Sequence, residues 1–436
     1  RTVSYFMHSE TALKCAWQDS DSYTSIITFS TEISFKLKMT ILQINTVGNS
    51  GSTGRIAEQI GIEAIRNGWD SHIACAIRIS RSRSNIVRVG SPWHRYPNVL
   101  WARIFDSDSP LAKISTLKFV EDIKRISPDI IHLHNLHGYY LHAPTLLKFL
   151  GEYGRPVVWT LHDCWPMTGH CAYFDFCGCE KWKSACAECP QKREYPASWI
   201  FDRSAKNHSE KIELISKIKN LTLVPVSNWI GETAKKSKLK FRHLQVIRNG
   251  INLEIFRPSK TEILSSPKTV LFVANKWEKR KGFDFIPEIS AALGKDFECL
   301  VVGVDGKQEK YLRERGMRAM GKLENAQQLS QMYSSASVFA NPTMQDNYPT
   351  VNLEAAACGT PVVTFDSGGT PETIPNPGAG SVVARGDVSA MVSEIKKFAA
   401  LDKSEISKIC RKTAEENFDA KAAFGKYCEL YRSFVP

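Results

Sequence analysis

The stretch MTILQINTVGNSGSTGRIAEQIGIEA, residues 39–64, contains the pattern that decides the fold. An apolar run over Thr40–Val47 comes first, and apolar residues at helical spacing follow it. The turn between them carries three glycines, Gly48, Gly51 and Gly54. A strand, a glycine-rich turn and an amphipathic helix in this order are typical of the opening unit of a parallel α/β sheet. The stretch therefore predicts a Rossmann-like domain.

The same alternation continues along the chain and then begins again. The expected strands are Ser71–Cys75, Asp129–Leu133, Pro156–Leu161 and Leu221–Val226 in the first series, and Thr269–Val273, Cys299–Val302, Val338–Ala340 and Pro361–Phe365 in the second. Helical patterns such as Leu111–Ile126 and Ala326–Ser335 separate them. Alternation of this kind indicates parallel sheets covered on both faces. We therefore expect an α/β protein with two doubly wound Rossmann-like domains in series.

The expected domain boundaries follow from this division of the 436-residue chain. Residues 39–255 form the N-terminal domain and residues 256–416 the C-terminal domain, with a linker near 247–268 where turn formers cluster. Residues 1–38 do not fit the pattern and are interpreted as an N-terminal extension, either non-native or disordered.

Charge and hydrophobicity limit the partners of the protein. No apolar run reaches the roughly 18 residues of a membrane span, and no secretory leader is recognisable, so a cytoplasmic location is expected. The net charge of +12 implies an acidic partner, which can be nucleic acid, anionic lipid or a phosphorylated substrate. The basic cluster at residues 235–242 contains one aromatic residue, Phe241, which argues against a platform for single-stranded nucleic acid. A solvated face and a patch that binds anionic membrane surfaces both remain open for this cluster.

Gly51 and Gly54 are the first candidate binding residues. They lie between a strand and a helix, where backbone N–H groups at a helix N-terminus can bind an anion. The loop lacks the spacing of both the dinucleotide fingerprint and the P-loop, so NAD binding and P-loop chemistry are disfavoured. A purely structural turn would use the same glycines.

A second candidate is the basic run at Lys276, Arg280 and Lys281, directly after the first strand of the second series. In open α/β sheets, ligands bind at the carboxyl ends of the strands. Arg offers a fork of donors to phosphate oxygens and Lys a point charge, so a diphosphate is the expected ligand. A basic loop exposed to water is the alternative.

The third motif is NPTMQDNYPTVNLEAAACGTPVV, residues 341–363. Two carboxylates, Asp346 and Glu354, flank a turn and the start of a helix, and the amides of Thr350 and Val351 lie near that helix start. Carboxylates accept hydrogen bonds from sugar hydroxyls, and helix amides bind phosphate. Compensation of the helix dipole is the alternative reason for acidic residues here.

This motif resembles the hallmark of the retaining family 4 glycosyltransferases of the GT-B fold, in which two acids precede an Ala-rich, Gly-x-Pro-Val-Val ending. Three further segments are similar to the same family: Val246–Asn252, Arg280–Gly282 and Thr160–Asp163. The resemblance covers residues 39–436 and implies two Rossmann-like domains that face each other across a cleft. It also implies that residues 417–436 form a C-terminal helix that crosses back to the first domain.

The resemblance also implies roles for particular residues. Glu354 would bind the donor ribose and Asp346 the hydroxyls of the transferred sugar, with His162 beside that sugar. Arg280 and Lys281 would bind the diphosphate. Two positions depart from the family pattern: the first acid is Asp346 where Glu is usual, and residue 275 is Asn where many members carry a phosphate-binding Arg.

The predicted function is therefore retaining transfer of a hexose-type sugar from a UDP- or GDP-linked donor to a glycan or polyprenyl-diphosphate-linked acceptor, in surface polysaccharide biosynthesis. No cofactor is needed for catalysis, no nucleic acid is expected, and the enzyme would lie in the cytoplasm or at the inner face of the membrane. A nucleotide-sugar epimerase or hydrolase of the same fold is one alternative. A zinc-stabilised basic nucleic-acid-binding protein is another, but it leaves Asp346 and Glu354 unexplained.

A cysteine-rich loop at residues 164–190 carries a further hypothesis. Cys171, Cys179, Cys186 and Cys189 have the number and spacing of ligands in a closed four-thiolate zinc site. A branch of the same family has a similar loop. Buried thiols without a metal are equally consistent with the sequence, because free cysteine packs as a small apolar residue. Four thiolates leave no open position on zinc, so any such ion would be structural.

Overall fold

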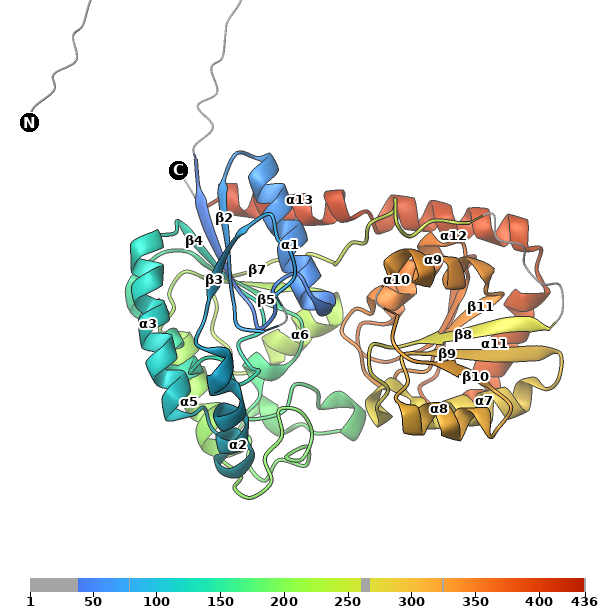
Figure 1. Cartoon of the computed structure of the whole chain (residues 1–436), viewed down its shortest axis with the longest axis horizontal. Helices are drawn as coiled ribbons and strands as arrows, with labels where there is room; N and C mark the ends of the chain where they lie inside the picture. The colour runs from blue at the N-terminus through green and yellow to red at the C-terminus, as the bar shows by residue number, and fades with distance from the viewer. Residues whose placement is uncertain (1–37, 78, 260–266, 324, 435–436) are drawn as a thin grey trace, which may run out of the picture. The chain divides into compact units, whose positions relative to one another are not determined.

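The computed structural model describes residues 38–77, 79–259, 267–323 and 325–434. Two parallel sheets form its framework (Figure 1). The first has the order β3-β2-β1-β4-β5-β6-β7 and the second β10-β9-β8-β11-β12-β13. This arrangement confirms the predicted fold class. The predicted extension lies outside the described residues, except for Lys38.

The strands of the first sheet are β1 (Thr40–Ile44), β2 (Asp70–Cys75), β3 (Asn85–Arg88), β4 (Ile130–Leu133), β5 (Val157–Leu161), β6 (Leu221–Pro225) and β7 (His243–Leu244). Those of the second are β8 (Lys268–Val273), β9 (Phe297–Val302), β10 (Arg318–Met320), β11 (Val338–Asn341), β12 (Val362–Phe365) and β13 (Gly380–Val383). Each central strand was predicted from its apolar run. The sequence analysis missed β3, β7, β10 and β13, which are the four edge strands.

The missed strands share a physical property. Every residue of the central strands β4 and β5 is buried, whereas β3 and β7 contain no buried residue. A strand buried on both faces needs a continuous apolar run, but an edge strand can be short and polar. The sequence signal for a strand therefore fades at the sheet edges.

Helices separate the strands in sequence. They are α1 (Gly51–Arg66), α2 (Arg95–Phe105), α3 (Pro110–Ile126), α4 (Ala143–Tyr153), α5 (Ser204–Ser216) and α6 (Asn228–Lys236) in the first half, and α7 (Ile286–Leu293), α8 (Gly306–Arg313), α9 (Ala326–Ser335), α10 (Thr350–Ala357), α11 (Val388–Ala400), α12 (Lys403–Asn417) and α13 (Ala420–Arg432) in the second. Within the described part of the chain, no helix combines the length and apolar composition needed to span a bilayer.

The last helix, α13, packs on the first sheet. Phe424, Tyr427 and Tyr431 of α13 share a buried cluster with Ile56 and Ile60 of α1. The Tyr427 hydroxyl lies 3.0 Å from Thr160 Oγ1 of β5. Residues from Lys38 onward form one compact unit, so the domain boundary drawn at residues 255 and 256 stays a prediction.

Candidate active site

A cavity of about 370 Å³ is lined by residues from both halves of the chain. The loop at the start of α1 contributes Gly51 and Arg55, and the end of β8 contributes Asn275. Thr350, Val351 and Glu354, at the start of α10, also line it. A cavity of this size can hold a small organic ligand. Four of the predicted site residues therefore share one cavity.

Glu354 is a partly buried carboxyl that forms no ion pair with any described residue. Burial raises the pKa of Glu354 to about 7, against the opposing effects of the Tyr333 hydroxyl and the Arg55 guanidinium. The Tyr333 hydroxyl donates to Glu354 Oε2 at 3.1 Å. A carboxyl held in this way can accept further hydrogen bonds from a ligand. Arg55 had no distinct signal in the sequence beyond its place in the first turn after the glycine loop.

A second group of predicted residues lies around Asp346, and we refer to Arg280, Lys281 and Asp346 as the ionic cluster. Lys281 Nζ forms an ion pair with Asp346 Oδ2, and Arg280 Nη1 donates to the Gln345 carbonyl at 2.7 Å. Burial raises the pKa of Asp346, but the Lys281 ammonium and the Arg280 guanidinium outweigh it and hold the pKa below its ordinary value. The carboxyl of Asp346 is therefore ionised at neutral pH.

Gly282 allows the basic loop to reach the ionic cluster. Its φ is +78°, and a Cβ at this position would lie 1.9 Å from the Pro342 carbonyl oxygen. Only glycine fits this close approach in the left-handed region. The Met344 amide then donates to the Arg280 carbonyl at 2.8 Å, which fixes the loop against the Asp346 motif. The glycine of Arg-Lys-Gly is therefore needed to bring the cations to the carboxylate.

The cysteine-rich loop of the first half contacts this cluster. The Arg280 guanidinium lies over the Tyr173 ring, 3.7 Å from its centroid. Gln345 Oε1 accepts the backbone N–H groups of Asp175 at 2.9 Å and Phe176 at 3.2 Å. The sequence analysis did not identify Tyr173 or Gln345, because a contact between distant segments leaves no local pattern.

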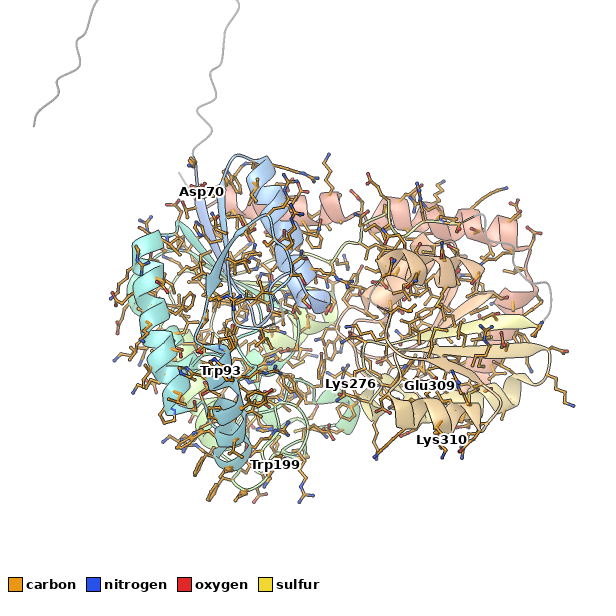
Figure 2. All side chains as sticks on the ribbon, viewed as in Figure 1. Asp70, Trp93, Trp199, Lys276, Glu309 and Lys310 are labelled. Atoms are coloured by element: carbon orange, nitrogen blue, oxygen red, sulfur yellow. The ribbon has the colours of Figure 1, made fainter. Side chains whose placement is uncertain are left out.

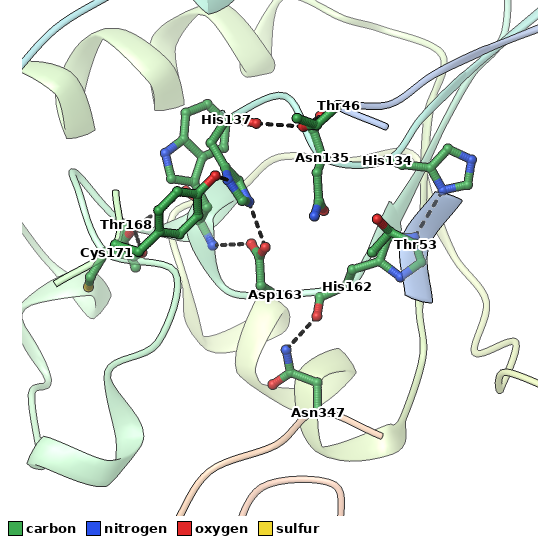
Figure 3. A network of polar contacts seen from close by, with 12 residues as sticks. Thr46, Thr53, His134, Asn135, His137, His162, Asp163, Thr168, Cys171 and Asn347 are labelled. Atoms are coloured by element: carbon green, nitrogen blue, oxygen red, sulfur yellow. Dashed lines mark hydrogen bonds and ion pairs between the residues drawn. The ribbon is translucent and has the colours of Figure 1, made fainter. Parts of the chain in front are cut away.

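His162 belongs to a chain of hydrogen bonds that we call the histidine chain, formed by Gln43, His134 and His162. Figure 3 shows its contact between His134 and His162. Gln43 Nε2 donates to the Ala57 carbonyl at 2.8 Å, so its Oε1 faces His134 Nε2 at 3.0 Å and accepts from it. Burial lowers the pKa of His134 well below its ordinary value, so the ring is neutral and its Nδ1 is an acceptor. His162 Nε2, 2.9 Å away, must therefore donate.

The histidine chain fixes one tautomer of His162. Burial lowers the pKa of His162 to about 4, although the Asp163 carboxylate opposes this shift. A neutral ring with its proton on Nε2 has an unprotonated Nδ1. The partly exposed His162 can therefore accept a hydrogen bond from a ligand hydroxyl. Asn347 Nδ2 donates to the His162 carbonyl at 2.7 Å, so the backbone of His162 lies next to the Asp346 motif (Figure 3).

Four predicted donor-binding residues do not line the cavity: Arg280 and Lys281 belong to the ionic cluster, whereas Lys276 and Gly54 lie elsewhere. Lys276 is exposed and pairs with Glu278 at 2.5 Å, because its side chain points to solvent after the end of β8. Gly54 is buried, and a Cβ there would lie 3.0 Å from Val47 Cγ2, so this glycine lets α1 pack on the preceding loop. This packing supports the structural turn that was the alternative for Gly54, and donor binding by Gly54 stays a prediction. Asn275, where the family pattern departs, does line the cavity.

The cysteine-rich loop brings its four candidate ligands together. Cys171, Cys179, Cys186 and Cys189 line one small cavity, and the Gly169 N–H donates to Cys186 Sγ at 3.3 Å. A hydrogen bond from the Cys171 thiol lowers the pKa of Cys189 to about 7. Across the described ranges, however, no group of three or more His, Cys, Asp or Glu side chains could hold a metal ion as placed. Zinc binding stays a prediction, which elemental analysis of tag-free protein tests.

A second cavity, of about 300 Å³, lies in the first half and had no signal in the sequence. It is lined by residues of α2, α4, α5 and the segment around Pro196, among them His137, Arg203 and Lys211. His137 Nε2 pairs with Asp163 Oδ2 at 2.7 Å, next to His162 in sequence. Burial lowers the pKa of Lys211 to about 7, and its Nζ donates to the Trp165 carbonyl at 2.6 Å.

The fold and this site define a class: a two-domain enzyme with a ligand cavity between two parallel α/β sheets. The model of the family described as Glycosyltransferase Family 4 matches residues 53–255, and that described as Glycosyl transferases group 1 matches residues 267–400. The chain belongs to this glycosyltransferase family, as the resemblance implied, and it is a glycosyltransferase. His134 and His162 of the histidine chain lie in the first matched segment, Gln43 lies before it, and the ionic cluster lies in the second segment.

Individual proteins are similar to the chain in sequence or in fold. The chain is 27% identical over 379 residues to the putative colanic acid biosynthesis glycosyl transferase WcaC of Escherichia coli K12, covering 81% of this chain and 89% of that protein. Sucrose-phosphate synthase of Thermosynechococcus elongatus has a similar fold, with a TM-score of 0.67 at 18% identity over 91% of this chain and 99% of that one. Anabaena HepE in complex with UDP-glucose aligns with a TM-score of 0.62 at 15% identity, covering 91% and 100% of the two chains.

Proposed function

We propose that this glycosyltransferase transfers a hexose-type sugar, with retention of configuration, from a UDP- or GDP-linked donor to a glycan or polyprenyl-diphosphate-linked acceptor in surface polysaccharide biosynthesis. One observation carries the proposal: Glu354 and the start of α10 line a cavity of about 370 Å³, and the same motif places the ionic cluster beside His162. The relative named for colanic acid biosynthesis and the UDP-glucose complex of a similar fold support the pathway and the donor.

In this proposal the nucleotide occupies the 370 Å³ cavity. Glu354 accepts hydrogen bonds from the ribose hydroxyls, because its carboxyl lines the cavity and a carboxylate has several acceptor positions beyond the one that the Tyr333 hydroxyl occupies. The amides of Thr350 and Val351 lie in the first turn of α10 and are directed toward a phosphate, which the helix dipole also favours.

The ionic cluster acts on the leaving group and on the sugar. The bond between the anomeric carbon and the β-phosphate oxygen breaks, and the acceptor oxygen bonds to the same face of that carbon. The proton of the acceptor hydroxyl passes to the departing phosphate oxygen, so no protein base is required. Arg280 and Lys281 stabilise the negative charge on the phosphate. The step needs no metal ion in this proposal.

Binding of the donor would rearrange the ion pair in the cluster. Lys281 is paired with Asp346 in the structure, and a diphosphate would compete for that ammonium. Asp346, released in part from Lys281, would accept hydrogen bonds from hydroxyls of the sugar. His162 Nδ1 adds a neutral acceptor on the opposite side of that sugar, since the histidine chain holds its proton on Nε2.

The test is a comparison of ligands and variants. Arg280→Ala together with Lys281→Ala should weaken binding of a nucleoside diphosphate more than binding of the nucleoside, measured by calorimetry. Equal losses for both ligands would place these cations outside the diphosphate site. Lys276→Ala is the matched control, because this exposed lysine pairs with Glu278 and should change neither affinity.

Incubation with the donor alone separates the alternative activities. A transferase leaves UDP-glucose or GDP-mannose largely intact without an acceptor, whereas an epimerase or a hydrolase consumes it. Steeply salt-dependent binding of DNA or RNA would instead favour the nucleic-acid-binding alternative. We place the enzyme in the cytoplasm, at the inner face of the membrane, because a polyprenyl-linked acceptor is anchored there.

A further inference from the structure

Helix α2 exposes apolar side chains and buries a polar one. Its single buried residue is Asn98, whose Nδ2 donates to the Tyr139 carbonyl at 3.0 Å. Tyr96 and Leu100 of α2 are 78% and 54% exposed, and Trp93 in the turn before it is 83% exposed. A surface helix ordinarily turns its apolar stripe to the core. In α2, by contrast, Tyr96 and Leu100 face outward.

Neighbouring segments extend this apolar surface. The Trp199 and Phe201 amides donate to the carbonyls of Arg103 and Ile104 at 2.6 and 3.1 Å, so the segment 199–201 is attached to the end of α2. At the other end, His94 Nδ1 lies 3.2 Å from Ser115 Oγ of α3. Figure 2 shows Trp93 and Trp199 near opposite ends of α2. We call the exposed side chains of these segments the apolar face: Trp93, Tyr96, Leu100, Leu111, Ile114, Leu117, Trp199, Ile200 and Phe201.

The apolar face is a local feature. Fourteen large hydrophobic side chains are exposed among the described residues, and ten of them lie between residues 93 and 201. The C-terminal half has four, Tyr311, Val382, Leu401 and Ile409. Scattered exposed apolar residues are normal, but a concentrated patch indicates an interaction site.

The composition of the face favours a lipid surface over a protein. Trp and Tyr are typical of the boundary between water and lipid, and α2 and α3 also expose Arg95, Lys113 and Lys118. These cations complement anionic headgroups. A symmetric dimer formed through the same face would bring the cations of two copies together, which like-charge repulsion opposes.

The 300 Å³ cavity borders this face and contains unsatisfied polar groups. Ala102 and Ser107, at the end of α2, line it, as does Ala197, two residues before Trp199. Two of its lining nitrogens, Arg203 Nε and His170 Nε2, are buried without a hydrogen-bond partner among the described residues. Buried polar groups are ordinarily paired, so these two nitrogens indicate a missing ligand.

The donors of this cavity fit an anion. Asp106 Oδ1 lies 2.5 Å from His170 Nδ1, and although burial opposes it, this contact raises the pKa of His170 and so favours the protonated ring, in which Nε2–H is a donor. Lys206 and Lys211 also line the cavity. Its remaining carboxyls are Asp108, which accepts the Ala143 amide at 2.8 Å and whose pKa burial raises to about 6, and Glu210.

We propose that the 300 Å³ cavity binds the diphosphate head of an amphiphilic acceptor, while the apolar face holds the protein on the anionic lipid surface in which its hydrocarbon chain lies. This inference rests on the proposed function and names where its lipid-linked acceptor binds. It also moves the membrane contact from the cluster at 235–242, where no large apolar side chain is exposed, to α2 and α3.

Binding of farnesyl diphosphate tests the cavity. We expect calorimetry to show tighter binding of farnesyl diphosphate than of inorganic diphosphate or farnesol, and an affinity at least about tenfold lower in the variant Arg203→Gln with Lys206→Gln. UDP binding in the same variant should not change, so failure of the donor site and failure of this cavity are distinguishable. Equal affinity for farnesyl and inorganic diphosphate, or displacement of farnesyl diphosphate by UDP, would overturn the assignment.

Co-sedimentation with vesicles tests the apolar face. We expect the full chain to bind phosphatidylglycerol vesicles, and the variant Trp93→Ser, Tyr96→Ser, Leu100→Ser to bind them at least about tenfold more weakly. The control variant Tyr311→Ser, Leu401→Ser, Ile409→Ser removes an equal number of exposed apolar residues and should bind normally. Unchanged binding in the first variant refutes the face. Loss of binding only in Lys235→Glu with Lys236→Glu would return the contact to the basic cluster, and self-association abolished by the first variant would assign the face to a second copy.

Discussion

The histidine chain and the ionic cluster lie at the carboxyl ends of strands in two similar sheets, yet they handle charge in opposite ways. The histidine chain is neutral, because burial lowers the pKa values of His134 and His162. The ionic cluster holds an ionised Asp346 between two cations. The same architecture thus offers hydrogen bonds without charge on one side and charge on the other. A sugar hydroxyl needs the neutral hydrogen-bonding groups of the histidine chain, and a diphosphate needs the charged groups of the ionic cluster.

The ionic cluster should respond most strongly to substitution. Asp346→Asn should lower transfer by about 100-fold or more, because a charged acceptor for the sugar is lost. It should also lower the free energy of unfolding by about 2 kcal/mol, since Lys281 is left partly buried without its partner. Sugar-transfer assays and urea denaturation measure the two effects.

A double variant separates the two roles of Asp346. Asp346→Asn with Lys281→Met removes both charges, so stability should recover while transfer stays low. Recovery of both would mean that Asp346 serves only to neutralise Lys281.

Glu354→Gln should lower transfer by roughly 100-fold and yet stabilise the ligand-free protein. The pKa of Glu354 is raised to about 7 in the folded state, so the folded protein binds more protons than the unfolded chain between about pH 4.5 and 7. The stability that this bound proton contributes is fully present below about pH 4.5 and is lost as the pH rises through about 7. Removing the carboxyl should therefore add about 1 to 3 kcal/mol at pH 8 and little at pH 4.

Thermal or urea unfolding of wild type and Glu354→Gln at pH 4, 6 and 8 measures this difference. A variant that is destabilised equally at every pH, or one with normal turnover and donor affinity, would contradict the role of Glu354. Glu309→Gln on α8 is a suitable control, because its carboxylate is paired with Arg313 away from the cavity.

The histidine chain should respond more weakly, because Gln43 acts on the ligand only through two imidazoles. Gln43→Leu removes the acceptor of His134 Nε2–H and frees the tautomer of His162. We expect kcat/KM to fall by about tenfold, as for other positioning groups. Nitrogen-15 NMR of the His162 ring should show mixed tautomers in the variant and one tautomer in the wild type.

A single tautomer in Gln43→Leu, with reduced activity, would indicate a packing defect in place of a positioning role. His243→Asn, at an exposed histidine of β7, should leave both activity and the His162 signal unchanged.

The surface contact between the cysteine-rich loop and the C-terminal half should matter least. Arg385 Nη2 pairs with Asp175 Oδ2 at 2.7 Å, and this pair joins the cysteine-rich loop to the C-terminal half. Both side chains are about a third exposed, so Arg385→Ala should cost less than about 1 kcal/mol and change KM by no more than a fewfold. Gln345→Ala, which removes a buried acceptor of two loop amides, should have the larger effect on KM. The reverse order would show that the surface ion pair holds the loop.

The sequence by itself determined the central strands, the fold class and the motif with Asp346 and Glu354. These features are local: a strand buried on both faces needs a continuous apolar run, and the glycine of Arg280–Gly282 marks a position where no side chain fits. Local patterns also placed Gly51, Thr350, Val351 and Glu354 in one cavity. Gly54 and Lys276 lie outside that cavity, because glycine also serves packing turns and lysine also serves solvated loops.

Only the tertiary structure decided which distant residues meet. The hydrogen bond between His134 and Gln43 joins positions 91 residues apart, and the hydrogen bond from Asn347 to His162 joins positions 185 residues apart. The opposite pKa shifts of Asp346 and Glu354 were equally hidden, since the two acids lie in one motif and differ only in the cations around them. Burial and the surrounding charges depend on the whole fold, so two carboxylic acids in one motif acquire different pKa values.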